Sequence, residues 1–200
     1  MRIERKWFLA IAVVLTSLWL AVNARTGADE TRIRWDLVNI DFTTGTLLAG
    51  GSASARANDG SKITLTGSGT FKPDDTEEVT GGGNWTTFDS TGAMTGSGTY
   101  EVKRLVKFDV APGTFPLKID NIGNPLDIRG GLVFLRIRYS PGGQSGILVV
   151  SCALGGTSPA TVFEGITASK GFVDYWNREM PTPAVNGDRT AFHVVPESVN

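Results

Sequence analysis

Two short segments carry ionisable side chains that could bind or polarise a small molecule. Arg136 and Arg138 stand in an otherwise apolar run, so they belong either to the solvent-exposed end of a strand or to a polar cavity. Asp174, Tyr175 and Trp176 begin a segment that mixes aromatic with ionisable groups, a mixture common at binding surfaces. The same mixture also suits a last segment that closes the mouth of a barrel. We predict one ligand-binding site at one end of the domain, made of Arg136, Arg138, Asp174, Tyr175 and Trp176.

Three other groups with possible chemistry have simpler structural interpretations. His193 is the only histidine and Cys152 the only cysteine, so a zinc site would need several carboxylate ligands, which is unusual. A Ser-His-Asp nucleophile triad is not favoured, because the chain has no Gly-x-Ser-x-Gly elbow before a helix. Cys152 lies in an apolar run, which is typical of a buried thiol. Asp74, Asp75, Glu77 and Glu78 form an acidic cluster. Their spacing does not match that of a calcium-binding loop, so we predict the solvated tip of a hairpin. No metal and no cofactor is expected.

The elements that must position these side chains read as β-strands. The chain has 25 glycines, and runs of alternating apolar and polar residues recur between turn signals. The segments 58–61 and 89–92 contain Asp-Gly or Ser-Thr-Gly turns and predict tight hairpins. One short helix is expected to begin at Ser169 and to run through Trp176, because its apolar residues are three to four apart.

One internal repeat bears on the architecture. Residues 66–70 and 95–99 both read Thr-Gly-Ser-Gly-Thr, and an aromatic residue follows each copy. Glycine at every second position predicts that Gly67, Gly69, Gly96 and Gly98 lie where another backbone or a large ring packs close. Such bending strands favour a barrel. We therefore predict one all-β domain over 31–196, a single antiparallel β-barrel of roughly eight strands; a two-sheet β-sandwich is the alternative.

The longest irregular stretch is 111–131, where three prolines and four glycines prevent regular pairing. A loop of this length in a compact domain is more often functional than not.

The first residues resemble a secretory signal. Arg2, Arg5 and Lys6 precede an apolar run over 7–22, and Ala24 offers a small residue for cleavage. We predict a signal helix in a signal peptide over 1–24, a linker over 25–30 and a tail over 197–200 around the β-domain. Cleavage after Ala28 is the other option, and an uncleaved anchor would be the chain's only membrane contact. The predicted location is secreted or periplasmic.

The net charge of the chain argues against two classes of partner, nucleic acids and anionic membranes. Residues 1–24 contain three basic groups and one acidic group, so the remaining chain has 16 basic and 19 acidic residues and a net charge of −3. This mixed, mildly negative chain is unlike a nucleic-acid binder, which needs a basic face. It also lacks the basic cluster of a protein that binds anionic membranes. The sequence does not determine the oligomeric state.

Two segments, 84–88 and 163–176, resemble small exported bacterial β-proteins of unknown activity, which implies no site residues. The succession of glycine-rich strands loosely resembles the barrels of the calycin and allene-oxide-cyclase-like groups, an analogy of architecture alone. Two functions follow as expectations: binding of a small, partly apolar ligand, or a cyclase- or isomerase-like enzyme. A structural role in the cell envelope is a third. Inward-facing aromatic residues that fill the barrel would weaken the ligand interpretation, and ionisable groups in a cavity would favour the enzyme.

Overall fold

The computed structural model describes residues 31–115, 117, 119–156 and 158–195. Over these residues the chain is all-β, with one short 3-10 helix, Pro125–Asp127. The predicted signal segment 1–24, the linker 25–30 and the tail 197–200 lie outside the described residues. The strands are β1 (Arg32–Asp41), β2 (Thr46–Ala49), β3 (Ser52–Arg56), β4 (Lys62–Thr66), β5 (Ser68–Lys72), β6 (Asp75–Val79), β7 (Gly82–Phe88), β8 (Met94–Ala111), β9 (Ile119–Asp120), β10 (Ile128–Ser140), β11 (Ser145–Cys152), β12 (Gly165–Lys170), β13 (Val173–Tyr175), β14 (Asn177–Arg178) and β15 (Thr190–Val195).

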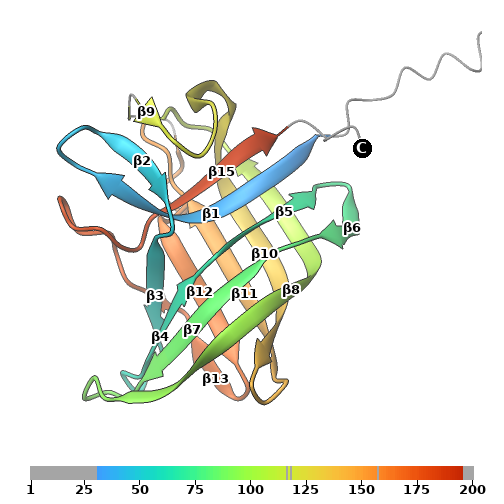
Figure 1. Ribbon diagram of the computed structural model, residues 1–200, viewed down its shortest axis with the longest axis vertical. Helices are drawn as coiled ribbons and strands as arrows, with labels where there is room; N and C mark the ends of the chain where they lie inside the picture. Colours follow the sequence, from blue (N-terminus) through green and yellow to red (C-terminus); the bar gives the residue numbers. More distant parts are fainter. Residues whose placement is uncertain (1–30, 116, 118, 157, 196–200) are drawn as a thin grey trace, which may run out of the picture. The chain divides into compact units, whose positions relative to one another are not determined.

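Six strands close into an antiparallel barrel, which confirms the predicted barrel over the sandwich (Figure 1). Around the ring, β1 pairs with β5, β5 with β7, β7 with β8, β8 with β10, β10 with β15, and β15 with β1. Extra strands β11, β12 and β13 continue from β10, and β4, β3 and β14 continue from β7. The described strands outnumber the predicted eight because hairpin turns and bulges divide the longer runs.

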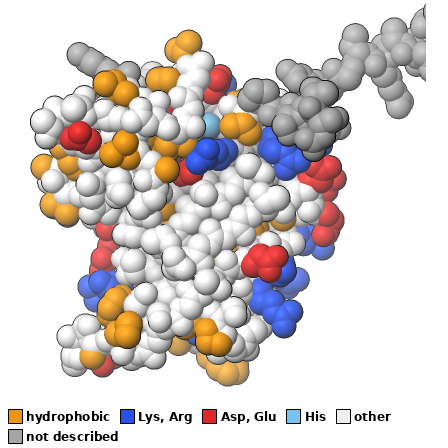
Figure 2. Space-filling model, in the orientation of Figure 1, with side chains coloured by type: hydrophobic (Ala, Val, Ile, Leu, Met, Phe, Trp, Pro, Cys, Tyr) orange, Lys and Arg blue, Asp and Glu red, His pale blue; other side chains and the backbone are white. Residues whose placement is uncertain are grey.

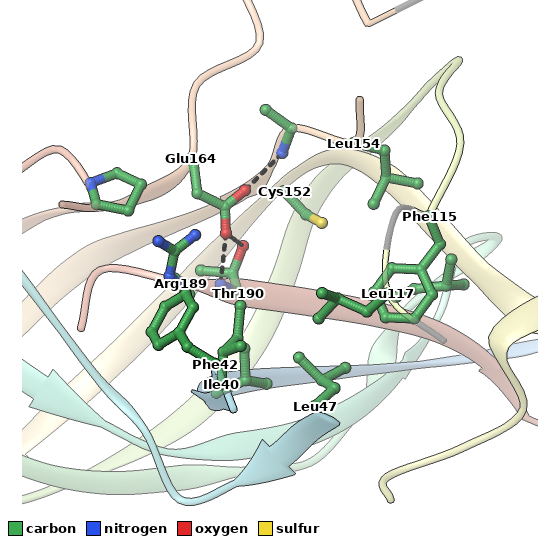
Figure 3. Close-up of a pocket in the computed structure, with 14 residues that line it drawn as sticks. Ile40, Phe42, Leu47, Phe115, Leu117, Cys152, Leu154, Glu164, Arg189 and Thr190 are labelled. Carbon is green, nitrogen blue, oxygen red and sulfur yellow. Dashed lines mark hydrogen bonds between the residues drawn. The ribbon is translucent and has the colours of Figure 1, made fainter. Parts of the chain in front are cut away.

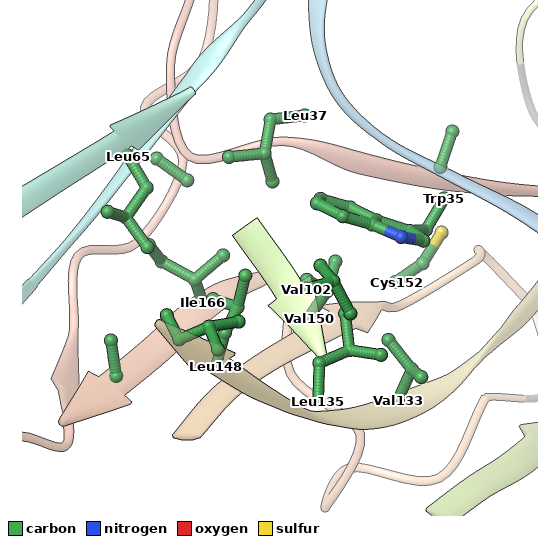
Figure 4. Packing of buried hydrophobic residues seen from close by; sticks show 14 of the residues in the cluster. Trp35, Leu37, Leu65, Val102, Val133, Leu135, Leu148, Val150, Cys152 and Ile166 are labelled. Carbon is green, nitrogen blue, oxygen red and sulfur yellow. The ribbon is translucent and has the colours of Figure 1, made fainter. Parts of the chain in front are cut away.

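Side chains fill the barrel interior (Figure 4). Trp35 and Tyr139 are fully buried, and Trp85 and Tyr100 are nearly so. Trp85 and Tyr139 meet edge to face, with their ring centroids 5.9 Å apart. The barrel therefore has a packed core at this level, and a ligand cavity must lie elsewhere.

Three of the four repeated glycines, Gly67, Gly69 and Gly98, lie where the chain packs too close for a side chain, as predicted, whereas Gly96 has a looser approach to the Trp85 ring. A Cβ on Gly69 would lie 2.6 Å from Gly81 Cα and 2.7 Å from Trp35 Nε1. A Cβ on Gly67 would collide with Tyr100 and Gly82, and one on Gly98 with the carbonyl of Ser140. Real side chains do not tolerate such distances, so glycine here is a packing requirement.

The predicted helix from Ser169 to Trp176 is wrong. Strand β12 continues to Lys170, Gly171 turns the chain with a φ of 62°, and β13 follows antiparallel to β12. Only glycine adopts this φ freely, so the turn reverses the chain where a helix would continue. A spacing of three to four over so short a window does not separate a helix from a hairpin.

Candidate functional site

The structure does not gather the five predicted site residues into one opening. Arg136 and Arg138 of β10 are exposed on the outer surface, so the pair marks a solvated face. Asp174 and Trp176 are also exposed, whereas Tyr175 between them is buried.

Three of the exposed members of that set line two different grooves, and Arg136 lines neither. Arg138 lines a groove of about 470 Å³ beside Glu101 and Lys103. Asp174 and Trp176 line another groove on the outside of β11 and β12. These two strands separate β10 from β13. A shared site therefore has no geometric support, and ligand binding by these residues stays a prediction.

A third cavity, of about 330 Å³, lies beside the β1–β2 hairpin (Figure 3). Its wall is largely apolar, and residues far apart in sequence supply it. The apolar lining consists of Val38, Ile40, Phe42, Leu47, Phe115, Leu117, Ile128, Cys152, Ala153, Leu154 and Pro181. Figure 2 shows apolar side chains gathering on the surface over the same hairpin. A concave, mostly apolar cavity of this size is typical of a small-molecule site.

The long segment 111–131 covers one side of this cavity with Phe115, Leu117 and Ile128. Strand β9 in this segment pairs in parallel with β2, and the Asn121 N–H donates to the Leu47 carbonyl at 3.1 Å. The predicted irregular stretch 111–131 is wrong in part, because β9 pairs with β2 within it and β10 begins at Ile128. The segment lies against the cavity, and its functional role stays a prediction.

A buried hydrogen bond between Asp120 and His193 fixes the same segment to the barrel. Asp120 Oδ2 lies 2.6 Å from His193 Nε2, and both side chains are almost wholly buried. Asp120 Oδ1 also accepts the N–H groups of Ile122 and Gly123. His193 therefore has the structural role expected for it, because it joins β15 to the cover of the cavity.

Glu164 supplies the acidic group at the polar end of the cavity. Its Oε2 accepts the Ala153 N–H at 2.8 Å, and its Oε1 accepts the Thr190 N–H at 2.6 Å. Burial raises the pKa of the Glu164 carboxyl to about 7, against the effect of these hydrogen bonds. A carboxyl that changes charge near neutral pH inside an apolar cavity is a candidate functional group.

Arg189 supplies the basic group at the same end. It lines the same cavity as Glu164, and its charge acts on the Glu164 carboxyl (Figure 3). Its Nη2 donates to the Thr182 carbonyl at 3.2 Å, and its Cζ lies 5.2 Å from the centre of the Phe42 ring. Its Nε is buried and has no hydrogen-bond partner among the described residues. Burying a charged donor in this way is costly unless an acceptor arrives.

Cys152 and the acidic cluster lie in the surroundings that the sequence indicated. Cys152 is buried and unpaired, and burial raises the pKa of its thiol well above the usual value. The acidic cluster lies at the β5–β6 hairpin, where Glu78 pairs with Arg32 at 2.7 Å. No group of three or more potential metal ligands occurs in the described part of the chain.

Sequence reasoning missed the cavity, because its wall comes from several segments with no common spacing. Two local signals point to it in retrospect. One is the long segment 111–131, and the other is Glu164, a lone acid between an aromatic residue and a strand.

Comparisons with protein-family models, with curated proteins and with solved structures found no match. The resemblances to exported β-proteins and to calycin-like barrels therefore stay predictions. Within residues 31–195, as far as they are described, no helix is long and apolar enough to cross a membrane.

Proposed function

We propose that this chain is an exported binding protein that holds one small, largely apolar molecule in the cavity beside the β1–β2 hairpin. One observation carries the proposal: an apolar cavity of about 330 Å³ has two ionisable groups, Glu164 and Arg189, at one end. Apolar walls give affinity through burial, and a few polar groups give orientation. The cavity borders the hydrophobic core, but the large aromatic residues that pack the barrel interior, Trp35 and Tyr139 among them, do not line it.

The enzyme alternative draws on the same two groups. A carboxyl with a pKa of about 7 could move a proton, and an arginine could polarise a carbonyl, as a cyclase or isomerase requires. Both Glu164 oxygens, however, accept backbone N–H bonds, from Ala153 and from Thr190. These bonds hold the carboxyl against the wall. We therefore favour binding, and turnover of a bound molecule would be the finding that favours the enzyme.

Export is the second part of the proposal. It rests on the basic residues, apolar run and small residues of the first 24 positions. The cleaved chain is expected to begin at Arg25 or at Asp29.

Native mass spectrometry of the protein purified from its own cells tests both parts. We expect a peak above the polypeptide mass that disappears after extraction with organic solvent, because an apolar ligand dissolves in that solvent. The remaining mass should correspond to a chain beginning at Arg25 or Asp29. A protein that carries nothing would argue against a resident ligand. An intact Met1 on a membrane-bound form would contradict cleavage.

A further inference from the structure

We infer that the cavity selects an apolar monoanion, whose charged group lies at Arg189 next to Glu164, and that the anion binds together with one proton. This inference rests on the proposed function, because it concerns the same cavity. It adds the chemical class of the ligand and a dependence of affinity on pH.

The buried Nε of Arg189 lacks a hydrogen-bond acceptor among the described residues. A guanidinium stays charged in proteins and offers five N–H donors. Among the described residues, Arg189 donates only to the Thr182 carbonyl, and its Nε is buried without an acceptor. Glu164 lies on the same cavity wall but forms no ion pair with it among those residues. A ligand that brings an anionic oxygen would satisfy the unpaired donor with a charge-assisted hydrogen bond.

The hydrogen bonds around the Glu164 carboxyl bear on its protonation state. Its two oxygens already accept the backbone N–H groups of Ala153 and Thr190. The Thr190 hydroxyl has one proton, and its Oγ1 lies 2.7 Å from the Ser151 carbonyl but 3.3 Å from Glu164 Oε1. The hydroxyl therefore donates to Ser151, and it can accept a hydrogen bond from Glu164 only if the carboxyl is protonated. The local bonding thus accommodates a neutral Glu164.

The charge balance in the cavity also bears on the protonation state of Glu164. A bound anion beside an ionised Glu164 would place two negative charges next to one arginine in a poorly solvated space. A protonated Glu164 leaves one anion against one guanidinium, which is the balanced arrangement. The carboxyl pKa of about 7 means that this proton is available near neutral pH.

The other charged groups near Glu164 do not change this balance. In the described chain Arg189 is the one charged group that acts on the Glu164 carboxyl. The carboxyl in turn acts on the thiol of Cys152, whose pKa is raised well above its usual value, chiefly by burial. The charge of Arg189 also acts on the Asp188 carboxyl, against the burial that raises its pKa. Asp188 does not line the cavity, and its Oδ1 accepts the Ser54 N–H at 2.6 Å.

Calorimetry with decanoate and decanol, which share one apolar chain, tests the inference. At about pH 6 we expect decanoate to bind at least about tenfold more tightly than decanol, because only decanoate pairs with Arg189. Above pH 7 the empty cavity has lost its proton and must recover it on binding. The decanoate dissociation constant should therefore rise by up to about tenfold per pH unit. The decanol constant should change little.

Two variants locate the effect, and their melting temperatures confirm that they fold. Arg189→Gln should abolish the preference for decanoate. Glu164→Gln should bind decanoate with no pH dependence between about pH 6 and pH 8. In the parent protein, buffers of different ionisation enthalpy should report uptake of up to one proton per decanoate above pH 7.

The outcomes separate this inference from the proposed function. Equal affinity for decanoate and decanol would overturn the anion selectivity and leave an apolar binding site. Tight decanoate binding that is independent of pH would overturn the coupled proton. If neither compound binds, and a neutral fluorescent amine also fails to bind, the proposed function itself is contradicted.

Discussion

Replacing Gly98 by alanine is expected to destabilise the barrel by about 3 kcal/mol, at the upper end of what overpacking usually costs. A Cβ at this position would collide with the Ser140 carbonyl oxygen and lie 2.8 Å from Pro141 Cδ. That carbonyl also accepts the Trp85 indole N–H at 3.1 Å. Two strands of the closed ring, β8 and β10, meet here, so neither backbone can move without breaking pairing around the ring.

Gly96→Ala in the same strand is the matched control. There a Cβ would lie 3.3 Å from the Trp85 ring and 3.4 Å from Thr87 Oγ1, and side chains can shift to accept it. Its expected cost is below about 1 kcal/mol. Urea unfolding of the two variants measures the difference. Equal stability of Gly98→Ala and Gly96→Ala would show that the close approach at Ser140 is not a constraint.

Replacing Asp120 by alanine is expected to cost about 3 kcal/mol and to loosen the cover of the cavity. The change leaves the buried His193 ring without its partner at 2.6 Å, and the N–H groups of Ile122 and Gly123 lose their acceptor. Because β9 and the following residues connect to Ile128 in the cavity wall, the substitution should lower the ligand affinity as well as the stability.

Asp109→Ala is the control for that change, because Asp109 forms an exposed pair with Lys107. Exposed pairs contribute little, so its stability should stay within about 0.5 kcal/mol of the parent. Hydrogen exchange should show faster exchange of residues 119–128 in Asp120→Ala alone. If the two aspartate variants proved equally stable, the buried contact would not be what holds this segment.

The sequence was sufficient for those parts of the fold that short-range chemistry determines. The Asp59 carboxylate accepts the Ser61 N–H at 2.9 Å in the hairpin predicted for 58–61, and Asp89 accepts the Thr91 N–H at 2.9 Å in the one predicted for 89–92. The glycine repeat predicted close packing because glycine has no side chain, so another backbone or a ring can approach it wherever the strand lies in the fold. The helix at Ser169 failed because one glycine turn outweighs a short apolar spacing.

The candidate site could not be predicted in the same way. Ile40, Leu47, Leu117 and Leu154 each look like ordinary core residues, and only the crossing of strands and loops leaves a cavity between them. Glu164 becomes distinctive through its burial and its two backbone donors, which depend on tertiary contacts. The arginines that stand out in sequence, Arg136 and Arg138, are solvated, whereas Arg189 is the one at the cavity.

The cavity beside the β1–β2 hairpin is expected to take a small apolar molecule. Titration with the neutral dye N-phenylnaphthylamine tests this claim in the parent, in Ala153→Phe and in Ala93→Phe. Ala153 lines the cavity, and a ring there would occupy it, whereas Ala93 lies in an exposed turn between β7 and β8. We predict saturable binding to the parent and to Ala93→Phe, and at least about tenfold weaker binding to Ala153→Phe. Equal binding to all three, with unchanged melting temperatures, would contradict the claim, because the dye would then be bound somewhere else.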